Sequence, residues 1–153
     1  VRVSAAGGIY QHPDREVPDT FFMTIEYPSK HTVVLASSMA NRQGLPMIIR
    51  GHKATISFDG RGTTIAPEDE YQEEFKKMFG QTPLNIDRFY VNSEERANHM
   101  DNFIDCIRSR ENPVLDVEFG YKVQVAITLG VTAYRENKVC YFDPATEKVI
   151  EKS

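Results

Sequence analysis

The sequence predicts an α+β fold, in which an open, predominantly antiparallel β-sheet has two or three helices packed on one face. Up to Pro67 the chain consists of short segments in which apolar and polar residues alternate, separated by turns rich in glycine and proline. No segment with helical spacing lies between them as a parallel crossover, so neighbouring strands should pair antiparallel. After Pro67, apolar residues recur at steps of three and four, which is typical of helices.

Six strands are expected in the first part of the chain. The strand with the clearest alternation has Phe21, Met23 and Ile25 on one face and Phe22 and Thr24 on the other. A short turn joins it to the next strand, so these two should form an antiparallel pair. A glycine-rich turn before the last strand indicates a further hairpin, because glycine accepts a positive φ without steric cost. The six expected strands cover residues 1–6, 19–27, 32–40, 46–50, 53–58 and 63–66.

Two helices are expected after these strands. The first covers 68–80, and residues 81–91 should form an irregular connection. The second helix follows Asn92, which together with Glu95 approximates a capping box. Pro113 prevents its continuation, since proline lacks a backbone N–H. The expected apolar stripe of this helix consists of Ala97, Met100, Phe103, Ile104 and Ile107.

A third helix should begin at Asp116, a residue type that caps helix N-termini, and end at Asn137. Gly120 and Gly130 lower its helix propensity, so their place beside an apolar stripe indicates close packing against another backbone. The expected stripe consists of Phe119, Val123, Ala126, Ile127, Gly130 and Tyr134. Two short strands should follow, at 139–142 and 148–150.

Composition excludes several classes of protein. The 153 residues suffice for one domain with a core, and their net charge of −4 comes without any dense basic run, so nucleic acid is not expected as a partner. No apolar run approaches the ~20 residues of a membrane span, and no signal peptide opens the chain. Cys106 and Cys140 lack the spacing of a redox or zinc site, and two reduced thiols fit a cytoplasmic protein. Because Val1 already lies in a strand-like pattern, we expect a fragment whose upstream part is missing.

The titratable residues form no recognisable catalytic or metal-binding pattern. His12, His31, His52 and His99 are scattered and lack zinc-ligand spacing, so no metal site is expected. Candidate pairs have simpler explanations: Asp101 with Asp105 lie on a solvated helix face, and Arg108 with Arg110 suit the end of a helix dipole. No nucleophile, base and orienting group occur together, so a complete hydrolase is the weakest interpretation.

Three segments in the last third of the chain carry a family pattern. Residues 99–113 read HMDNFIDCIRSRENP, residues 116–120 read DVEFG, and residues 140–144 read CYFDP. In this order and spacing they resemble the C-terminal domain of the glucose-fructose oxidoreductase / inositol dehydrogenase family. The segments 26–28 and 49–56 fit the same domain. The sequence departs from the family at Lys30 and His31, in a turn that usually holds glycine, and at Ala54, where a second glycine is usual.

The resemblance implies that residues 1–153 form the substrate-side and oligomerisation domain of an NAD(P)-dependent sugar or polyol oxidoreductase. Such enzymes hold NAD or NADP on an N-terminal Rossmann domain, which is absent from this chain. The family's catalytic lysine lies in a Glu-Lys-Pro motif and its acid/base histidine in an Asp-x-x-x-His motif, and neither motif occurs here. No catalytic or cofactor-binding residue is therefore expected, and the isolated domain should be inactive.

Two features remain as candidate functional elements. His99 matches a family position and is a candidate contact near the domain junction or the substrate cleft; the alternative is a helix-surface or packing histidine. Phe22 and Val34 lie opposite the main apolar face of their strands, so the second face of the sheet should pack against another subunit, giving a homo-oligomer. The alternative to an oxidoreductase domain is an independent antiparallel-sheet module that binds a small ligand or a protein partner.

Overall fold

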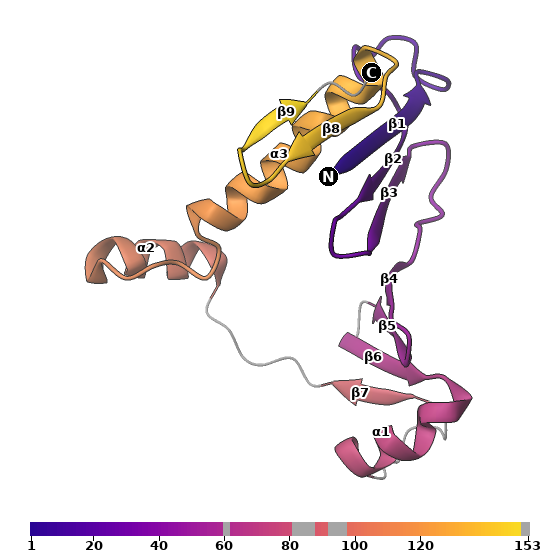
Figure 1. Cartoon of the computed structure of the whole chain (residues 1–153), viewed down its shortest axis with the longest axis vertical. Coiled ribbons are helices and arrows are strands. Elements are labelled where there is room, and N and C mark those ends of the chain that lie inside the picture. Colours follow the sequence, from indigo (N-terminus) through magenta and orange to yellow (C-terminus); the bar gives the residue numbers. More distant parts are fainter. Residues whose placement is uncertain (60–61, 81–87, 92–97, 151–153) are drawn as a thin grey trace. The chain divides into compact units, whose positions relative to one another are not determined.

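The computed structural model describes residues 1–59, 62–80, 88–91 and 98–150 (Figure 1). The chain divides into two compact units: unit 1 consists of Val1–Gln43 and His99–Ser153, and unit 2 consists of Gly44–Asn98. Each unit has its own antiparallel sheet. The predicted α+β class is confirmed, and the strands lie in two sheets where the sequence pattern suggested one.

Unit 1 contains a five-stranded sheet in the order β3-β2-β1-β8-β9. The central strand, β1, pairs antiparallel with β2 on one side and with β8 on the other, so the beginning and the end of the chain meet in the middle of the sheet. The predicted β2–β3 hairpin is confirmed. The elements of unit 1 are β1 (Arg2–Gly8), β2 (Thr20–Glu26), β3 (Thr32–Ser38), α2 (His99–Ser109), α3 (Val117–Arg135), β8 (Cys140–Asp143) and β9 (Lys148–Ile150).

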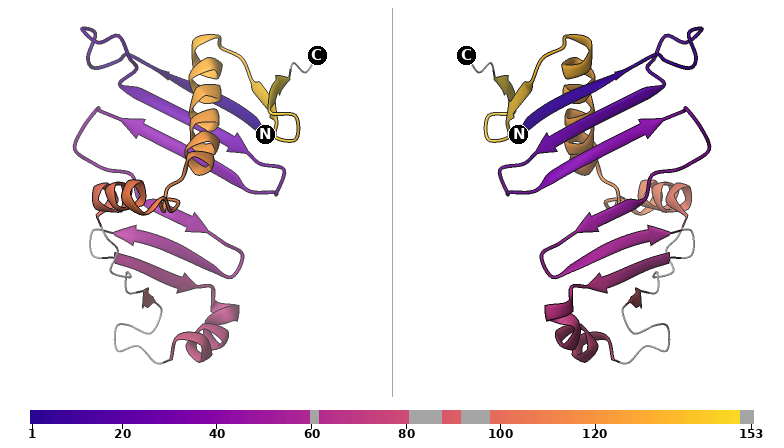
Figure 2. Two further views of the ribbon diagram at one scale, coloured as in Figure 1. Left: turned by 90° about the vertical axis from the view of Figure 1, so that its left-hand side faces the viewer. Right: turned by 90° about the vertical axis from the view of Figure 1, so that its right-hand side faces the viewer.

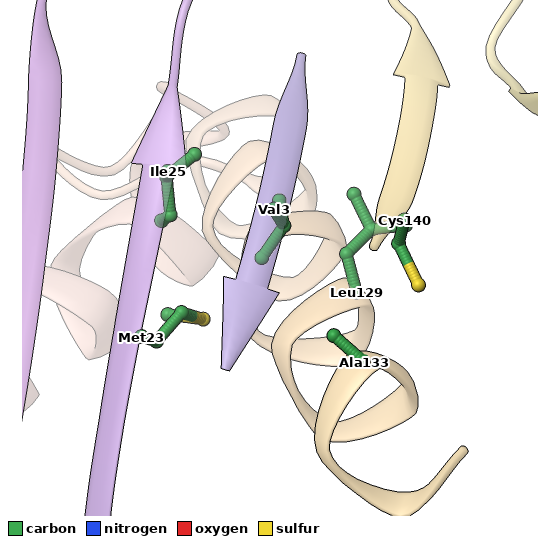
Figure 3. Close-up of a cluster of buried hydrophobic side chains, with 6 residues drawn as sticks. All are labelled: Val3, Met23, Ile25, Leu129, Ala133 and Cys140. Atoms are coloured by element: carbon green, nitrogen blue, oxygen red, sulfur yellow. The ribbon is translucent and has the colours of Figure 1, made fainter. Parts of the chain in front are cut away.

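The core of unit 1 lies between α3 and one face of this sheet (Figure 3). Alternate residues of the strands point toward the helix, because successive side chains of a strand face opposite sides. Burying an aliphatic side chain of this kind contributes roughly 1.5–3 kcal/mol, so this layer is the main stabilising contact of the unit. The buried cluster consists of Val3, Met23, Ile25, Leu129, Ala133 and Cys140.

The buried side of α3 differs from the predicted stripe. Leu129 and Ala133, which the prediction omitted, are buried against the sheet at 4% and 0% exposure, whereas the predicted Phe119, Val123 and Ile127 are exposed. The helix therefore presents Leu129, together with the small residues Gly130 and Ala133, to the strands, and Phe119, Val123 and Ile127 face outward. A period of 3.6 residues fits two adjacent apolar stripes on this helix, and only packing against the strands decides between them.

Gly130 explains why this side of α3 can approach the sheet. A Cβ built on Gly130 would lie 2.0 Å from the Sδ atom of Met23, while a Cβ on Gly120 would meet nothing within 4 Å. The prediction of close packing is thus correct for Gly130, although its neighbour is a side chain and not a backbone. For Gly120 the prediction is wrong, because that residue faces open space.

The ends of α3 follow the sequence signals. The Asp116 carboxylate accepts a hydrogen bond from the Phe119 N–H at 2.8 Å, which confirms it as the N-cap. At the other end Asn137 adopts a left-handed conformation with φ 49°, and the Lys138 N–H donates to the Ala133 carbonyl at 3.1 Å. This is the hydrogen bond of a Schellman motif, so Asn137 ends the helix as predicted.

Helix α2 begins at His99, and Asn98 is not helical. The predicted capping residues Asn92 and Glu95, and Ala97 of the predicted stripe, lie outside the described residues. The rest of the predicted stripe is present on the helix, but all of it is exposed, and α2 contains no buried residue. The exposed apolar residues are Met100, Phe103, Ile104 and Ile107.

Unit 2 contains a four-stranded antiparallel sheet in the order β4-β5-β6-β7. The predicted hairpin between its second and third strands is confirmed. The rings of Phe75 and Phe79, from a short helix, lie 6.2 and 5.3 Å from that of Phe89 and are tilted against it. Phe89 lies in a strand that the sequence analysis assigned to an irregular connection. The elements of unit 2 are β4 (Met47–Arg50), β5 (Ala54–Asp59), β6 (Gly62–Pro67), a 3₁₀ turn (Asp69–Tyr71), α1 (Gln72–Phe79) and β7 (Phe89–Val91).

The two glycines of α3 give a matched test of this packing. Gly120→Ala should raise the free energy of unfolding by about 0.5–1 kcal/mol, because alanine is the better helix former and the position is open. Gly130→Ala should lower it by about 1–3 kcal/mol, because the added methyl group displaces Met23 in the core. Chemical denaturation of both variants measures the difference.

A Met23→Ala background provides the control for this test. There the cost of Gly130→Ala should largely disappear, because the sulfur atom that the new methyl group meets is gone. Equal effects at Gly120 and Gly130 would contradict the packing of α3 described above.

Candidate functional site

The sheet of unit 1 has one face that points away from α3. Within the described residues of unit 1, no helix covers this face (Figure 2). The register places Phe22 of β2 beside Ala6 of β1 and Ala36 of β3, and places Thr24 beside Val34 in the adjacent row. Phe22 is 45% exposed and Val34 68% exposed. We call this surface the open face; it consists of Ser4, Ala6, Phe22, Thr24, Val34 and Ala36.

One end of the open face is polar. Arg2 pairs in register with Glu26 on one side and with Tyr141 on the other, and its guanidinium group forms an ion pair with the Glu26 carboxylate. The hydrogen bond to Tyr141, followed by the charge of Glu26, raises the pKa of Arg2 above its ordinary value. The open face thus has exposed apolar side chains beside an ion pair at one end.

Asp19 is a buried carboxylate that the sequence analysis did not single out. It is 2% exposed, and its Oδ2 atom accepts hydrogen bonds from the backbone N–H groups of Tyr10, Gln11 and His12 at 2.9, 2.7 and 2.9 Å. The Thr20 hydroxyl donates to Oδ1 at 3.1 Å. The side chain thus fastens the loop between β1 and β2 to the start of β2.

Two effects act on the charge of Asp19. Burial alone would raise the pKa of this carboxyl, but the backbone N–H groups of Gln11, His12 and Tyr10 outweigh burial, and the pKa lies below its ordinary value. The carboxylate therefore remains ionised and serves as a fixed internal anchor. The sequence signal that could have revealed it is an aspartate at the first residue of a strand after a loop rich in proline.

Two of the hollows beside α3 in unit 1 also border the strands. The larger, of about 460 Å³, is bordered by the loop that Asp19 holds and by Phe21, Ser37, Tyr134 and Arg135. Phe21 and Tyr134 meet edge to face there, with ring centres 5.8 Å apart. The smaller hollow, of about 300 Å³, lies near Val1 and is lined mainly by apolar side chains.

His99, the predicted cleft residue, is the first residue of α2, and its side chain is exposed. The helix residues that follow it have structural partners. Asn102 accepts a hydrogen bond from the Val114 N–H at 3.1 Å, which ties α2 to the segment after Pro113. Asp105 forms an ion pair with Arg108 at 3.6 Å on the exposed face. A role for His99 in a substrate cleft stays a prediction.

The other histidines have local structural contacts. The His31 Nδ1 atom lies 3.0 Å from the Ser29 hydroxyl, and the ring stacks on Tyr27 at a centre distance of 4.6 Å. In unit 2 the His52 Nε2 atom lies 3.0 Å from the Tyr71 hydroxyl. Within the described ranges, no three His, Cys, Asp or Glu side chains gather closely enough to hold a metal ion. No helix in those ranges has the length and apolar character that crossing a membrane requires.

The family model for the C-terminal alpha/beta domain of an oxidoreductase family matches residues 2–141. The chain belongs to this oxidoreductase family. The resemblance to the glucose-fructose oxidoreductase / inositol dehydrogenase family that the sequence analysis noted is thereby confirmed.

Two solved structures share the fold. One is a "putative oxidoreductase" from Thermotoga maritima, with a TM-score of 0.66 and 12% identity; the alignment covers 91% of this chain and 39% of that one. The other is an NAD-binding protein from Listeria innocua, with a TM-score of 0.63 and 18% identity, covering 90% of this chain and 44% of that one. The chain therefore spans less than half the length of either structure. A comparison with curated proteins found no match.

The residues that carry the family pattern in this oxidoreductase domain perform structural tasks. Asp116 caps α3, and Cys140 is buried in the core, where burial raises the pKa of its thiol. Asp143 accepts hydrogen bonds from the Ala145 N–H at 3.0 Å and the Thr146 hydroxyl at 2.7 Å, which shapes the β8–β9 turn. These residues of the pattern thus stabilise the fold of the domain.

Lys30 stands in a turn where the family usually has glycine. It adopts φ 62°, in the left-handed region, and its N–H donates to the Tyr27 carbonyl at 3.0 Å to close the β2–β3 turn. Glycine reaches this conformation without the steric cost that a side chain brings, which accounts for the usual family residue. In this chain the lysine itself adopts the left-handed conformation.

Gly7 and Gly8 do not form a nucleotide-binding turn. A nucleotide-binding turn places its glycines between a strand and a helix N-terminus, so that N–H groups point at the phosphates. Gly7 and Gly8 lie within β1 and are followed by a loop and another strand. A Cβ on Gly7 would lie 2.1 Å from the Thr20 carbonyl oxygen, so this glycine serves close strand packing.

The anchor role of Asp19 predicts a pH-dependent effect of Asp19→Asn. Because the pKa of this carboxyl is lowered on folding, its contribution to stability is complete above the ordinary value of about 4 and is lost as the pH falls through the lowered native value. The variant should be less stable than the parent at pH 7, and the difference should shrink in strong acid. Thermal unfolding between pH 7 and pH 2 measures it. Asp14→Asn, an exposed position in the same loop, is the control and should change little; a pH-independent difference would contradict the anchor role.

Proposed function

We propose that this chain is the C-terminal, substrate-side domain of a longer NAD(P)-dependent oxidoreductase that acts on a sugar or polyol. The observation that carries the proposal is the family match over residues 2–141. The NAD-binding protein that shares its fold supports the choice of cofactor, and the shared lengths of 39% and 44% support a further domain. We place that domain, with the Rossmann fold, before Val1.

The domain would contribute binding and assembly rather than chemistry. Oxidation of an alcohol needs a group that takes the hydroxyl proton while hydride leaves for the nicotinamide. The two motifs that supply such a group in the family do not occur in this sequence. The part left to this chain is to complete the wall of the substrate cleft, with His99 as the candidate contact, and to hold subunits together.

The open face is the candidate surface for subunit association. Phe22 and Val34 are exposed there beside small residues on the neighbouring strands. Two copies related by a two-fold axis could bury the same patch from both sides, which is the commonest arrangement of soluble oligomers. Burying one Phe or Val side chain contributes roughly 1.5–3 kcal/mol. A dimer would gain this free energy, because the side chains that a single subunit exposes to water would be buried. We propose a homo-oligomer built on this face, in the cytoplasm.

The longer reading frame tests the enzymatic part of this proposal. The residues before Val1 should encode a strand, a Gly-x-Gly-x-x-Gly turn and a helix, followed by Glu-Lys-Pro. The purified longer protein should reduce NAD⁺ or NADP⁺ with a member of a sugar and polyol panel, while the 153-residue chain should bind no NADH in calorimetry. Tight NADH binding by the 153-residue chain, or an upstream sequence without these motifs, would favour an independent binding module.

His99→Gln in the longer protein tests the cleft contact. The KM for the polyol should rise several-fold while the KM for the nucleotide stays the same, because the contact would be with the substrate alone. His12→Gln, on the loop between β1 and β2, is the matched control and should alter neither constant. Equal changes in both constants for His99→Gln would indicate a structural role.

A further inference from the structure

The smaller hollow of unit 1 lies where β1 begins. It has a volume of about 300 Å³, and Val1 forms part of its wall. Tyr27 and Pro144 border it from two turns of the sheet, and Val125 and Leu129 border it from α3. Such a volume accommodates one large apolar side chain, since a cavity of about 150 Å³ already takes up benzene. The hollow is thus an unfilled continuation of the core.

The backbone of Val1 is already part of the sheet. Its nitrogen donates to the Phe142 carbonyl at 2.7 Å, and the Phe142 N–H donates to the Val1 carbonyl at 2.9 Å. In register, Arg2 lies opposite Tyr141, and Val3 lies opposite Cys140. Val1 and Val3 therefore point to the same side, toward α3, because side chains alternate along a strand.

The same alternation predicts where the residues before Val1 would lie in a longer chain. The residue directly before Val1 would lie opposite Asp143 and point toward the open face. The residue before that would lie opposite Pro144 and point toward α3, which is the side of the hollow. Pro144 has no N–H to donate, so the ladder ends at this point and the chain is free to leave the sheet there.

We propose that the second residue before Val1 is apolar and fills this hollow, so that the incoming chain is locked between β8 and α3. The inference rests on the proposed function, in which a further domain precedes Val1. The occupant of the hollow would be a residue of the same polypeptide. Since Val1 is held in the sheet by two hydrogen bonds, the preceding domain would be attached to the core of unit 1 through a rigid strand.

Two dipeptide extensions that differ only in register test the proposal. One variant carries Leu-Thr before Val1, which places leucine opposite Pro144, and the other carries Thr-Leu, which places leucine on the open-face side. Leu-Thr should raise the thermal midpoint by about 3–6 °C over Thr-Leu, because only there is leucine buried. Methyl protons of that leucine should show NOEs to the rings of Tyr27 and Phe142, which border the hollow.

Ala126→Leu provides the control, because Ala126 lines the hollow from α3 and a leucine there would fill it from the helix side. In this background the advantage of Leu-Thr should vanish. Equal midpoints for the two extensions, or NOEs to open-face residues instead, would overturn the proposal. In the longer protein, aspartate at the second position before Val1 should lower the midpoint more than aspartate at the first.

These outcomes are independent of the enzymatic proposal. The dipeptides probe the 153-residue chain alone, so a register-dependent shift would stand even if the upstream reading frame encoded no nucleotide-binding domain. Conversely, an active longer enzyme whose two extensions behave alike would leave the oxidoreductase assignment intact and remove only the locked strand.

Discussion

The contact between α3 and the β1–β2–β8 layer is the constraint on which unit 1 depends. Val3 and Ala133 are wholly buried in it, and they come from opposite ends of the chain. The contact brings residues more than a hundred positions apart in sequence into one layer. It requires a small residue at Gly130, where the helix meets Met23, and a buried thiol at Cys140. Of the segments that carry the family pattern, residues 140–144 supply Cys140 to this contact, and residues 116–120 begin the helix that makes it.

Covering one face of the sheet leaves the other exposed, and this asymmetry links fold to proposed function. On the α3 side Val3, Met23 and Ile25 are buried, although Val33 and Leu35 of the edge strand β3 are exposed. On the open face Phe22 and Val34 are in contact with solvent. A domain without an assigned catalytic group can still determine how an enzyme assembles and how its cleft is closed. The Asp19 anchor fixes the loop between β1 and β2 against the sheet, and the Val1–Phe142 pair holds the start of β1 beside β8.

Local patterns predicted the elements well and their partners less well. The strand alternation around Met23, the Asp116 cap and the Asn137 terminus each depend on a few adjacent residues, and the structure has all three. The buried side of α3 was misjudged because Ala126 and Gly130 belong both to the predicted stripe and to the buried one, and only packing against the strands places Leu129 inside and Ile127 outside. The division into two sheets, the Asp19 anchor and strand β7 likewise depend on contacts between distant segments, which no local pattern encodes. His99 was placed on a helix correctly, and its role in a substrate cleft stays a prediction.

The central claim is that the open face joins subunits. The measurement that tests it most directly is the solution mass of the chain, determined by light scattering after size exclusion. The parent is compared with the variants Val34→Lys and Val117→Lys. Val34 lies on the open face and is 68% exposed, whereas Val117 begins α3 and is 84% exposed. If the open face joins subunits, the parent and Val117→Lys should have the mass of a dimer or higher oligomer, and Val34→Lys should be a folded monomer. A monomeric parent at high protein concentration, or an unchanged mass for Val34→Lys, would contradict the account.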